Sequence, residues 1–229
     1  MSKQAPTVEV DVISDVMCPW CYIGKKNLES AASQLGEIAI DVSWRPYQLD
    51  PTIPPGGKDR KEYLDAKFGG PEKAREIYKR VEDAGSAAGI GFRFDAIKVA
   101  PNTLDAHRVI RWAGGVSNEV QDRLVNRLFA LYFEQGGNVG DTEILVSAAG
   151  ECGMDEQLVR DLLASDQDKD AVIAEIGLAQ QMGVTGVPCF IVGKKYAVMG
   201  AQPASTLVQA IRQVQAERAE EEQFGTGQG

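Results

Sequence analysis

The first part of the chain shows two kinds of hydrophobic pattern in turn. Over residues 7–14, valines alternate with acidic residues, and this period of two is typical of a β-strand. Over residues 28–35 the apolar positions recur every three or four residues, which predicts a helix with one buried face. Alternation returns over residues 38–47. Strand, helix and strand form a βαβ unit, so we expect parallel strands joined by a right-handed crossover.

The middle of the chain predicts an all-helical block. A connection rich in proline and glycine spans residues 46–57, and such residues favour turns. From residue 59 to about residue 166 we find helical periodicities and no convincing strand. The expected helices of this block cover residues 61–68, 77–88, 104–113, 120–133, 143–149 and 156–164.

The last part of the chain returns to mixed structure. A helix is expected over residues 169–182, and short apolar runs at 189–192 and 196–199 predict an antiparallel hairpin. A final helix is expected from residue 203 to about 218. This order of elements predicts an α/β fold, with a mixed sheet covered by helices on both faces.

These elements divide the chain into one domain interrupted by another. Residues 1–55 and 167–219 form the sheet-containing domain, and residues 56–166 form the inserted helical domain. Residues 220–229 are acidic and then glycine-rich, a composition that favours a flexible tail. A chain of 229 residues is long enough to bury a proper core in this arrangement.

Charge and hydropathy exclude several classes of function. The net charge of −9 argues against a nucleic-acid partner and against an anionic membrane surface. No apolar run approaches the roughly 20 residues that span a bilayer. Residues 1–10 have no apolar segment of the kind found in secretory signals, so we expect a cytoplasmic protein. Disulfides rarely persist in that compartment, so the cysteines indicate chemistry rather than structural bridges.

The sequence Cys18-Pro19-Trp20-Cys21 stands between the first strand and the first helix. Proline suits the first helical turn, so both thiols lie at a helix start, where free N–H groups and the helix dipole favour a negative charge. The thiolate is the reactive form of cysteine. We therefore predict a thiol–disulfide exchange site, with Cys18 as the nucleophile and the more buried Cys21 as the resolving thiol. This pair is itself the redox centre, and it needs no metal and no other cofactor.

Four segments together resemble one protein family: Ser-Asp-Val-Met-Cys-Pro-Trp-Cys at 14–21, Trp-Arg-Pro-Tyr at 44–47, residues 102–108, and Gly-Val-Thr-Gly-Val-Pro at 183–188. They are similar to the DsbA-like proteins of the thioredoxin-fold superfamily. Within these, the chain resembles the FrnE-like subgroup, which is related to 2-hydroxychromene-2-carboxylate isomerases. The resemblance implies a thioredoxin fold with a large all-helical insertion in its middle.

The resemblance also implies a second functional element, Val187-Pro188. In this superfamily the corresponding proline is cis and abuts the cysteines, which leaves the preceding backbone free to pair with a substrate peptide. Two features depart from the relatives. Secreted DsbA-like oxidants carry Pro-His between the cysteines, where this chain has Pro19-Trp20, and the isomerases typically have serine in place of Cys18.

Three further residues are candidates for a role at the site. Asp11 lies within the first strand, either on a solvated face, which we favour, or as a buried carboxylate that aids proton transfer beneath the thiols. Trp20 either stacks on substrate and tunes the redox pair, or packs locally. His107 is the only histidine; we favour a structural or substrate-groove role over a Cys–His catalytic pair.

The two remaining cysteines are expected to be spectators. Cys189 follows Pro188, and strand alternation predicts that it points away from Cys18 as a small buried hydrophobe. Cys152 is expected to be unpaired and partly exposed. A zinc site made of Cys18, Cys21, Cys189 and His107 is disfavoured because a second closely spaced pair of ligands is missing.

The sequence thus favours a thiol–disulfide oxidoreductase or isomerase that acts on protein or small-molecule thiols. A glutathione-dependent isomerase or transferase is the first alternative, with glutathione as a candidate co-substrate. A chaperone-like protein that binds substrates in an apolar groove of the insertion is the second. The sequence predicts neither the direction of electron flow nor the oligomeric state.

Overall fold

Four strands form the central sheet in the order β2-β1-β5-β6 in the computed structural model, which describes residues 7–225. These strands are β1 (Thr7–Ser14), β2 (Ala39–Pro46), β5 (Cys189–Val192) and β6 (Tyr196–Met199). β1 runs parallel to β2 and antiparallel to β5, and β5 and β6 are antiparallel neighbours. The predicted βαβ unit and the predicted hairpin are both confirmed, and β1 joins them at the centre of the sheet.

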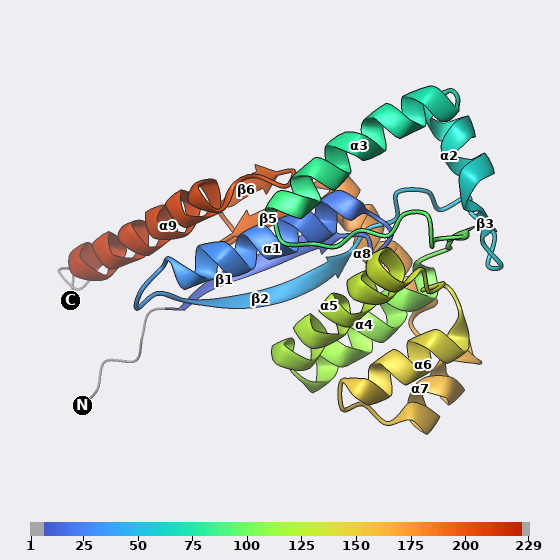
Figure 1. Ribbon diagram of the computed structural model, residues 1–229. Helices are drawn as coiled ribbons and strands as arrows, with labels where there is room; N and C mark the ends of the chain where they lie inside the picture. Colours follow the sequence, from blue (N-terminus) through green and yellow to red (C-terminus); the bar gives the residue numbers. More distant parts are fainter. Residues whose placement is uncertain (1–6, 226–229) are drawn as a thin grey trace.

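Helices cover both faces of this sheet, as the sequence predicts (Figure 1). On one face, α1 (Pro19–Ser33) and α9 (Ala204–Gly225) pack over the even-numbered valines of β1, which are fully buried. On the other face, α8 (Lys169–Gln181) contributes Ala179 to a smaller core with Ile13 and Cys189. Because neighbouring strand residues point to opposite faces, the alternation in β1 separates these two cores.

The insertion consists of two helical groups on either side of the N-terminal end of α1 (Figure 1). One group is α2 and α3, and the other is α4 to α7. The helices are α2 (Arg60–Phe68), α3 (Pro71–Ala87), α4 (Leu104–Val116), α5 (Asn118–Gln135), α6 (Thr142–Glu151) and α7 (Glu156–Leu163).

A short two-stranded ribbon flanks α2 and α3 in the sequence, with one strand before α2 and the other after α3. It pairs β3 (Lys58–Asp59) with β4 (Val99–Ala100) in antiparallel register. The expectation that residues 59–166 contain no strand was therefore wrong. Two residues are too few to produce an alternating pattern, so the sequence carries no signal for these strands.

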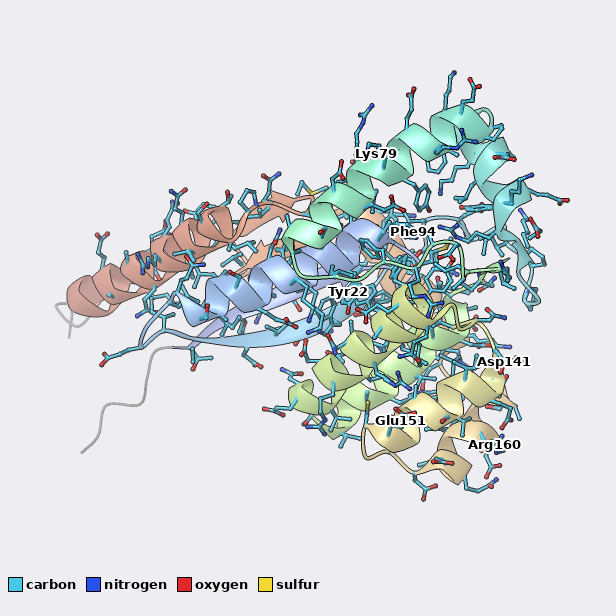
Figure 2. The ribbon with its side chains drawn as sticks, viewed as in Figure 1. Tyr22, Lys79, Phe94, Asp141, Glu151 and Arg160 are labelled. Atoms are coloured by element: carbon cyan, nitrogen blue, oxygen red, sulfur yellow. The ribbon has the colours of Figure 1, made fainter. Side chains whose placement is uncertain are left out.

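An aromatic cluster joins the start of α1 to the insertion. The ring of Tyr22 on α1 stacks on Phe129 of α5 with centroids 5.0 Å apart, and Phe92 lies 5.5 Å from Phe133. The hydroxyl of Tyr22 donates to Glu134 at 2.6 Å, and burial together with this carboxylate raises the pKa of Tyr22. Figure 2 shows Tyr22 at the junction between α1 and the helices of the insertion. The cluster holds the helix start, with its two cysteines, against the inserted domain.

The end of the chain differs from the expected tail. α9 continues to Gly225, past the expected helix end near residue 218 and into the segment 220–229. Residues 226–229 and 1–6 lie outside the described residues. Within residues 7–225, no helix is long and apolar enough to cross a bilayer.

Candidate active site

Cys18 is the N-cap residue of α1. Its N–H donates to the carbonyl of Asp15 at 2.9 Å, and its own carbonyl accepts the N–H of Cys21 at 3.0 Å. Pro19 occupies the first helical turn, where the missing N–H costs no helical hydrogen bond. The sulfur of Cys18 therefore stands at the positive end of the helix dipole, which favours negative charge there.

The two cysteines differ in their access to substrate. Both are free thiols, and 3% of Cys18 and 0% of Cys21 is exposed. Cys18 lines a groove at the surface, whereas Cys21 does not. Trp20, which is 38% exposed, stands between them and lines the same groove. Only Cys18 faces a space that a substrate can enter, which is the arrangement expected for a nucleophile and a resolving thiol.

The peptide bond between Val187 and Pro188 is cis, as the resemblance implies. The thiol of Cys18 lies 3.7 Å from the carbonyl oxygen of Val187, although the two residues are far apart in sequence. Within residues 7–225 no group accepts a hydrogen bond from the N–H of Val187. The backbone N–H next to the Cys18 thiol is thus unpaired among these residues.

Gly24 allows α1 to approach Pro188 closely. A Cβ at this position would lie 2.8 Å from Cγ of Pro188 and 3.1 Å from Cζ of Phe190. These atoms belong to a ring fixed to the backbone and to a fully buried side chain, so neither can move away easily. The missing side chain of Gly24 therefore sets the distance between the helix that carries the cysteines and the loop that carries Val187.

We expect the substitution Gly24→Ala to destabilise the protein. Overpacking costs about 1–3 kcal/mol, which exceeds the gain of about 1 kcal/mol from the higher helix propensity of alanine. Gly177 on α8 is the matched control, because a Cβ there meets nothing within 4 Å. Urea unfolding should show a loss of about 1 kcal/mol for Gly24→Ala and a small gain for Gly177→Ala. Equal effects of the two substitutions would contradict the role assigned to Gly24.

The groove beside Cys18 has a volume of about 270 Å³ and lies between the start of α1, helices α2 and α3, and the loop before β5. Its walls are mainly aromatic and aliphatic, with the tyrosines at 63, 78 and 132 among them. Two cations also line it. The Arg60 guanidinium lies over the ring of Tyr78 at 4.8 Å, and Lys67 donates to the hydroxyl of Tyr63 at 2.8 Å. No sequence pattern marks the residues of this wall, because most of them belong to helices with ordinary amphipathic patterns.

The environment of Cys21 disfavours its thiolate. Burial raises the pKa of the Cys21 thiol well above its ordinary value, and the adjacent sulfur of Cys18 adds to the rise. The Ser14 hydroxyl and the N–H of Asp15 face the same sulfur and oppose the rise. Cys21 therefore holds its proton in the folded protein.

The carboxylate closest to the cysteines in sequence is Asp15, which is fully buried. Its Oδ2 accepts the N–H of Leu49 at 2.8 Å, and its Oδ1 accepts the N–H of Met17 at 3.4 Å. Nε2 of His107 lies 3.5 Å from the same Oδ1. Asp15 fixes the loop between β1 and α1, a role the sequence interpretation missed. The sequence feature that could have indicated this role is an acidic residue between an apolar strand and the cysteine motif.

The two other polar candidates lie away from the groove. Asp11 points to the face of the sheet covered by α8, where it forms an ion pair with Arg45 at 2.7 Å, so the alternative of a carboxylate beneath the thiols is wrong. Neighbouring strand residues point to opposite faces of the sheet. Val10 and Val12 are buried on the face under α1, so Asp11 between them points to the other face. His107 is 3% exposed and lines two cavities between α4 and β2, not the groove of Cys18.

The remaining cysteines are both buried. Cys189 lies in the small core under α8, where burial raises the pKa of its thiol. This placement agrees with the expected buried hydrophobe. Cys152 is only 6% exposed, so the expectation of partial exposure was wrong. It is the C-cap residue of α6, and its carbonyl accepts a hydrogen bond from Arg123 of α5. Among the side chains of the described residues, no group of three or more histidine, cysteine and acidic residues is placed to hold a metal ion.

Comparisons with known proteins agree with this geometry. The family described as DSBA-like thioredoxin domain matches residues 9–212. A crystal structure of a probable DsbA oxidoreductase from Streptomyces coelicolor is 30% identical, with a TM-score of 0.81, and the match covers 92% of this chain and 91% of that chain.

Two more distant structures share the fold alone. One is a 2-hydroxychromene-2-carboxylate isomerase, with 16% identity, a TM-score of 0.68 and coverage of 93% of this chain and 98% of that chain. The other is the cytosolic disulfide reductase DsbM from Pseudomonas aeruginosa with GSH, with 14% identity, a TM-score of 0.56 and coverage of 94% and 99%. From the long match to the family and the likeness to the Streptomyces protein, we conclude that the chain belongs to the DSBA-like thioredoxin domain family.

Proposed function

We propose that the protein is a thiol–disulfide oxidoreductase that exchanges a Cys18–Cys21 dithiol or disulfide with substrate thiols. The observation that carries the proposal is the position of Cys18, at the N-cap of α1 and on the wall of a groove, with Cys21 buried one turn further along the helix. Cys18 attacks a substrate disulfide and forms a mixed disulfide, and Cys21 then displaces the substrate. The cytoplasmic location expected from the sequence remains part of the proposal.

The groove suggests how a substrate binds. Its volume of about 270 Å³ suits a few side chains of an extended peptide or a small thiol. The free N–H of Val187 would pair with a peptide backbone in the manner of an added β-strand, which recognises main chain and tolerates different sequences. The aromatic and aliphatic walls of the groove would bury apolar side chains next to the substrate disulfide.

Redox equilibration tests the proposal. The protein is equilibrated in buffers of graded glutathione and glutathione disulfide, free thiols are trapped by alkylation, and mass spectrometry measures the fraction with a Cys18–Cys21 disulfide. We expect one reversible two-electron transition, whose midpoint decides between a reductant and an oxidant or isomerase. If no such disulfide appears at any glutathione ratio, the exchange mechanism is wrong.

A glutathione-dependent isomerase or transferase is the second candidate. The cations Arg60 and Lys67 beside Cys18 favour it, because they could bind the carboxylates of a small anionic thiol. A structure of the same fold, DsbM, has been solved with GSH. Replacing Cys18 with serine distinguishes the two functions. Turnover of a chromene carboxylate with glutathione that survives Cys18→Ser would support the isomerase and contradict the exchange reaction.

A further inference from the structure

The segment that forms one wall of the groove is positively charged, although the protein is acidic. Residues 58–98, which include α2 and α3 (Figure 1), contain ten basic and eight acidic residues, so their net charge is +2. The whole chain has a net charge of −9, so the remaining residues have a net charge of −11. None of these ten basic side chains forms an ion pair with a carboxylate of the described residues.

One face of α2 directs part of this charge toward Cys18. The residues of α2 that line the groove recur every three or four positions, so they share one face of the helix. They are Arg60, Tyr63, Leu64, Lys67 and Phe68. Among the described residues, the lining of the groove contains no aspartate and no glutamate. A substrate in the groove therefore meets two cations and no carboxylate.

The contacts of the two cations hold them in place without neutralising them. The guanidinium of Arg60 lies over the ring of Tyr78 at 4.8 Å, and its Nη1 donates to the carbonyl of Phe94 at 3.2 Å. Its Nη2 makes no hydrogen bond among the described residues. Lys67 donates to the hydroxyl of Tyr63 at 2.8 Å, and burial raises the pKa of Tyr63, so this hydroxyl stays uncharged.

The carboxylates near this wall have other partners or lie outside the groove. Asp50 does not line the groove, and it accepts the hydroxyl and the N–H of Thr52 at 2.6 and 2.9 Å. A second cavity that Arg60 lines, with a volume of about 670 Å³, contains three aspartates beside its four basic residues. The groove differs from that cavity because its charge has one sign only.

We propose that Arg60 and Lys67 select peptide disulfides in which an acidic residue lies beside the reacting cysteine. The inference rests on the proposed exchange reaction and adds a substrate class to it. The groove is small, at about 270 Å³. An extended chain spans about 3.3–3.6 Å per residue, so a carboxylate that reaches the cations belongs to a residue within about two positions of the cysteine at Cys18. The N–H of Val187 would hold the main chain of the same peptide.

The carboxylate takes no part in making or breaking bonds. The thiolate of Cys18 bonds to one sulfur of the substrate disulfide, and the other substrate cysteine leaves as a thiolate that takes a proton from solvent. Cys21 then displaces the first cysteine, so the Cys18–Cys21 pair loses two electrons and the substrate disulfide gains them. A carboxylate bound to the cations speeds the first step because it holds the disulfide against Cys18.

Paired peptide substrates measure this charge preference. Two blocked tripeptides carry a central cysteine flanked by glutamate in one and by glutamine in the other, and each is oxidised to its symmetric disulfide. Reduced protein is mixed with an excess of one disulfide and quenched with acid at successive times, and mass spectrometry follows the loss of reduced protein. Dithiothreitol is the reference, because it attacks the same disulfides without a binding site. The selectivity is the glutamate-to-glutamine rate ratio for the protein, divided by the same ratio for dithiothreitol.

We expect a selectivity of about tenfold for wild type, equivalent to about 1.4 kcal/mol, which is the size of one hydrogen bond to a charged group. Arg60→Gln and Lys67→Gln should each lower the selectivity about threefold, which is half of this free energy. A change in the reactivity of Cys18 itself cancels in the ratio, because both peptides meet the same thiol. A purely structural role of either cation would therefore leave the selectivity unchanged.

Lys61→Gln is the matched control. Lys61 follows Arg60 on α2 and is exposed, but it lines the second cavity and not the groove. Its replacement removes the same charge from the same helix, and the selectivity should equal that of wild type. Arg60→Lys keeps the positive charge at the groove, so it should retain more selectivity than Arg60→Gln.

Oxidised glutathione and its ester, in which the carboxylates are blocked, test a small molecule as the source of the carboxylate. A charge preference between these two compounds, together with none between the peptides, would overturn the proposal. The cations would then serve a small anionic disulfide and not an acidic peptide.

The other outcomes separate this inference from the exchange reaction. A wild-type selectivity close to one, or a selectivity that both Arg60→Gln and Lys67→Gln leave unchanged, would overturn the inference and leave the exchange reaction intact. If reduced wild-type protein attacks none of these disulfides, the proposed function itself fails. If Arg60→Gln does not fold, Lys67→Gln carries the test alone, because Lys67 is an exposed side chain.

Discussion

Replacing Cys18 with serine is expected to reduce catalysed disulfide exchange to the uncatalysed rate. Cys18 is the only cysteine that lines the groove within the described part of the chain, so no other thiol can take its place at the substrate. Replacing Cys21 with serine has a different expected outcome. The first exchange proceeds, but the mixed disulfide at Cys18 is not resolved and accumulates. Dithiol-dependent reduction of insulin, followed by mass spectrometry of the trapped adduct, measures both effects.

Cys152→Ala is the control for this pair of variants. Cys152 is also buried and also a free thiol, but it caps α6 and does not line the groove. Its replacement should leave insulin reduction unchanged. Unchanged reduction by Cys18→Ser would show that the motif is not the reacting centre. A Cys21→Ser variant that turns over normally would show that a second external thiol resolves the intermediate.

The largest expected effect on stability comes from Arg108, which is fully buried in α4. Its guanidinium donates to the carbonyls of Leu162, Ser165 and Gln167 at 2.7–2.9 Å and forms an ion pair with Asp105 at 2.8 Å. These bonds join α4 to the last turn of α7 and to the connection between α7 and α8. We expect Arg108→Met to cost about 3–5 kcal/mol, because three carbonyls and a carboxylate lose their charged donor.

Urea unfolding and thermal melting check this expectation. For a chain of this size a loss of 3–5 kcal/mol lowers the melting temperature by about 6–20 °C. Arg111→Met is the matched control one turn along the same helix. Arg111 is 43% exposed and pairs with Glu175 at the surface, so its loss should cost at most about 1 kcal/mol. Similar costs for the two variants would contradict the role given to Arg108.

The sequence predicted those parts of the structure that depend on local pattern. Alternating valines located β1 and its two faces. This signal is strong because alternate residues of a strand point to opposite faces of the sheet. The contact of the Gly-Val-Pro loop with Cys18 was expected from the family resemblance. The cis form of Pro188 came from the family resemblance, because most bonds before proline are trans.

The parts that depend on distant contacts could not be predicted in the same way. Asp15 and His107 come together only because α4 of the insertion packs against β2, the neighbour of β1 in the sheet, and no local pattern encodes that contact. Cys152 was expected near the surface, but the packing of α5 and α6 buries it. The cations of the groove likewise belong to α2, whose sequence looks like that of any exposed helix.

The site is assembled from opposite ends of the chain, and this affects the protein while it is being made. Cys18 and Val187 meet although 169 positions separate them. At about 5–20 residues per second, a ribosome needs roughly ten to thirty seconds between the two. During that time the reactive thiol leaves the ribosome without the wall that later covers it. Until Cys152 is synthesised, the only other thiol in the nascent chain is Cys21, so any internal disulfide formed early joins the two cysteines of the motif.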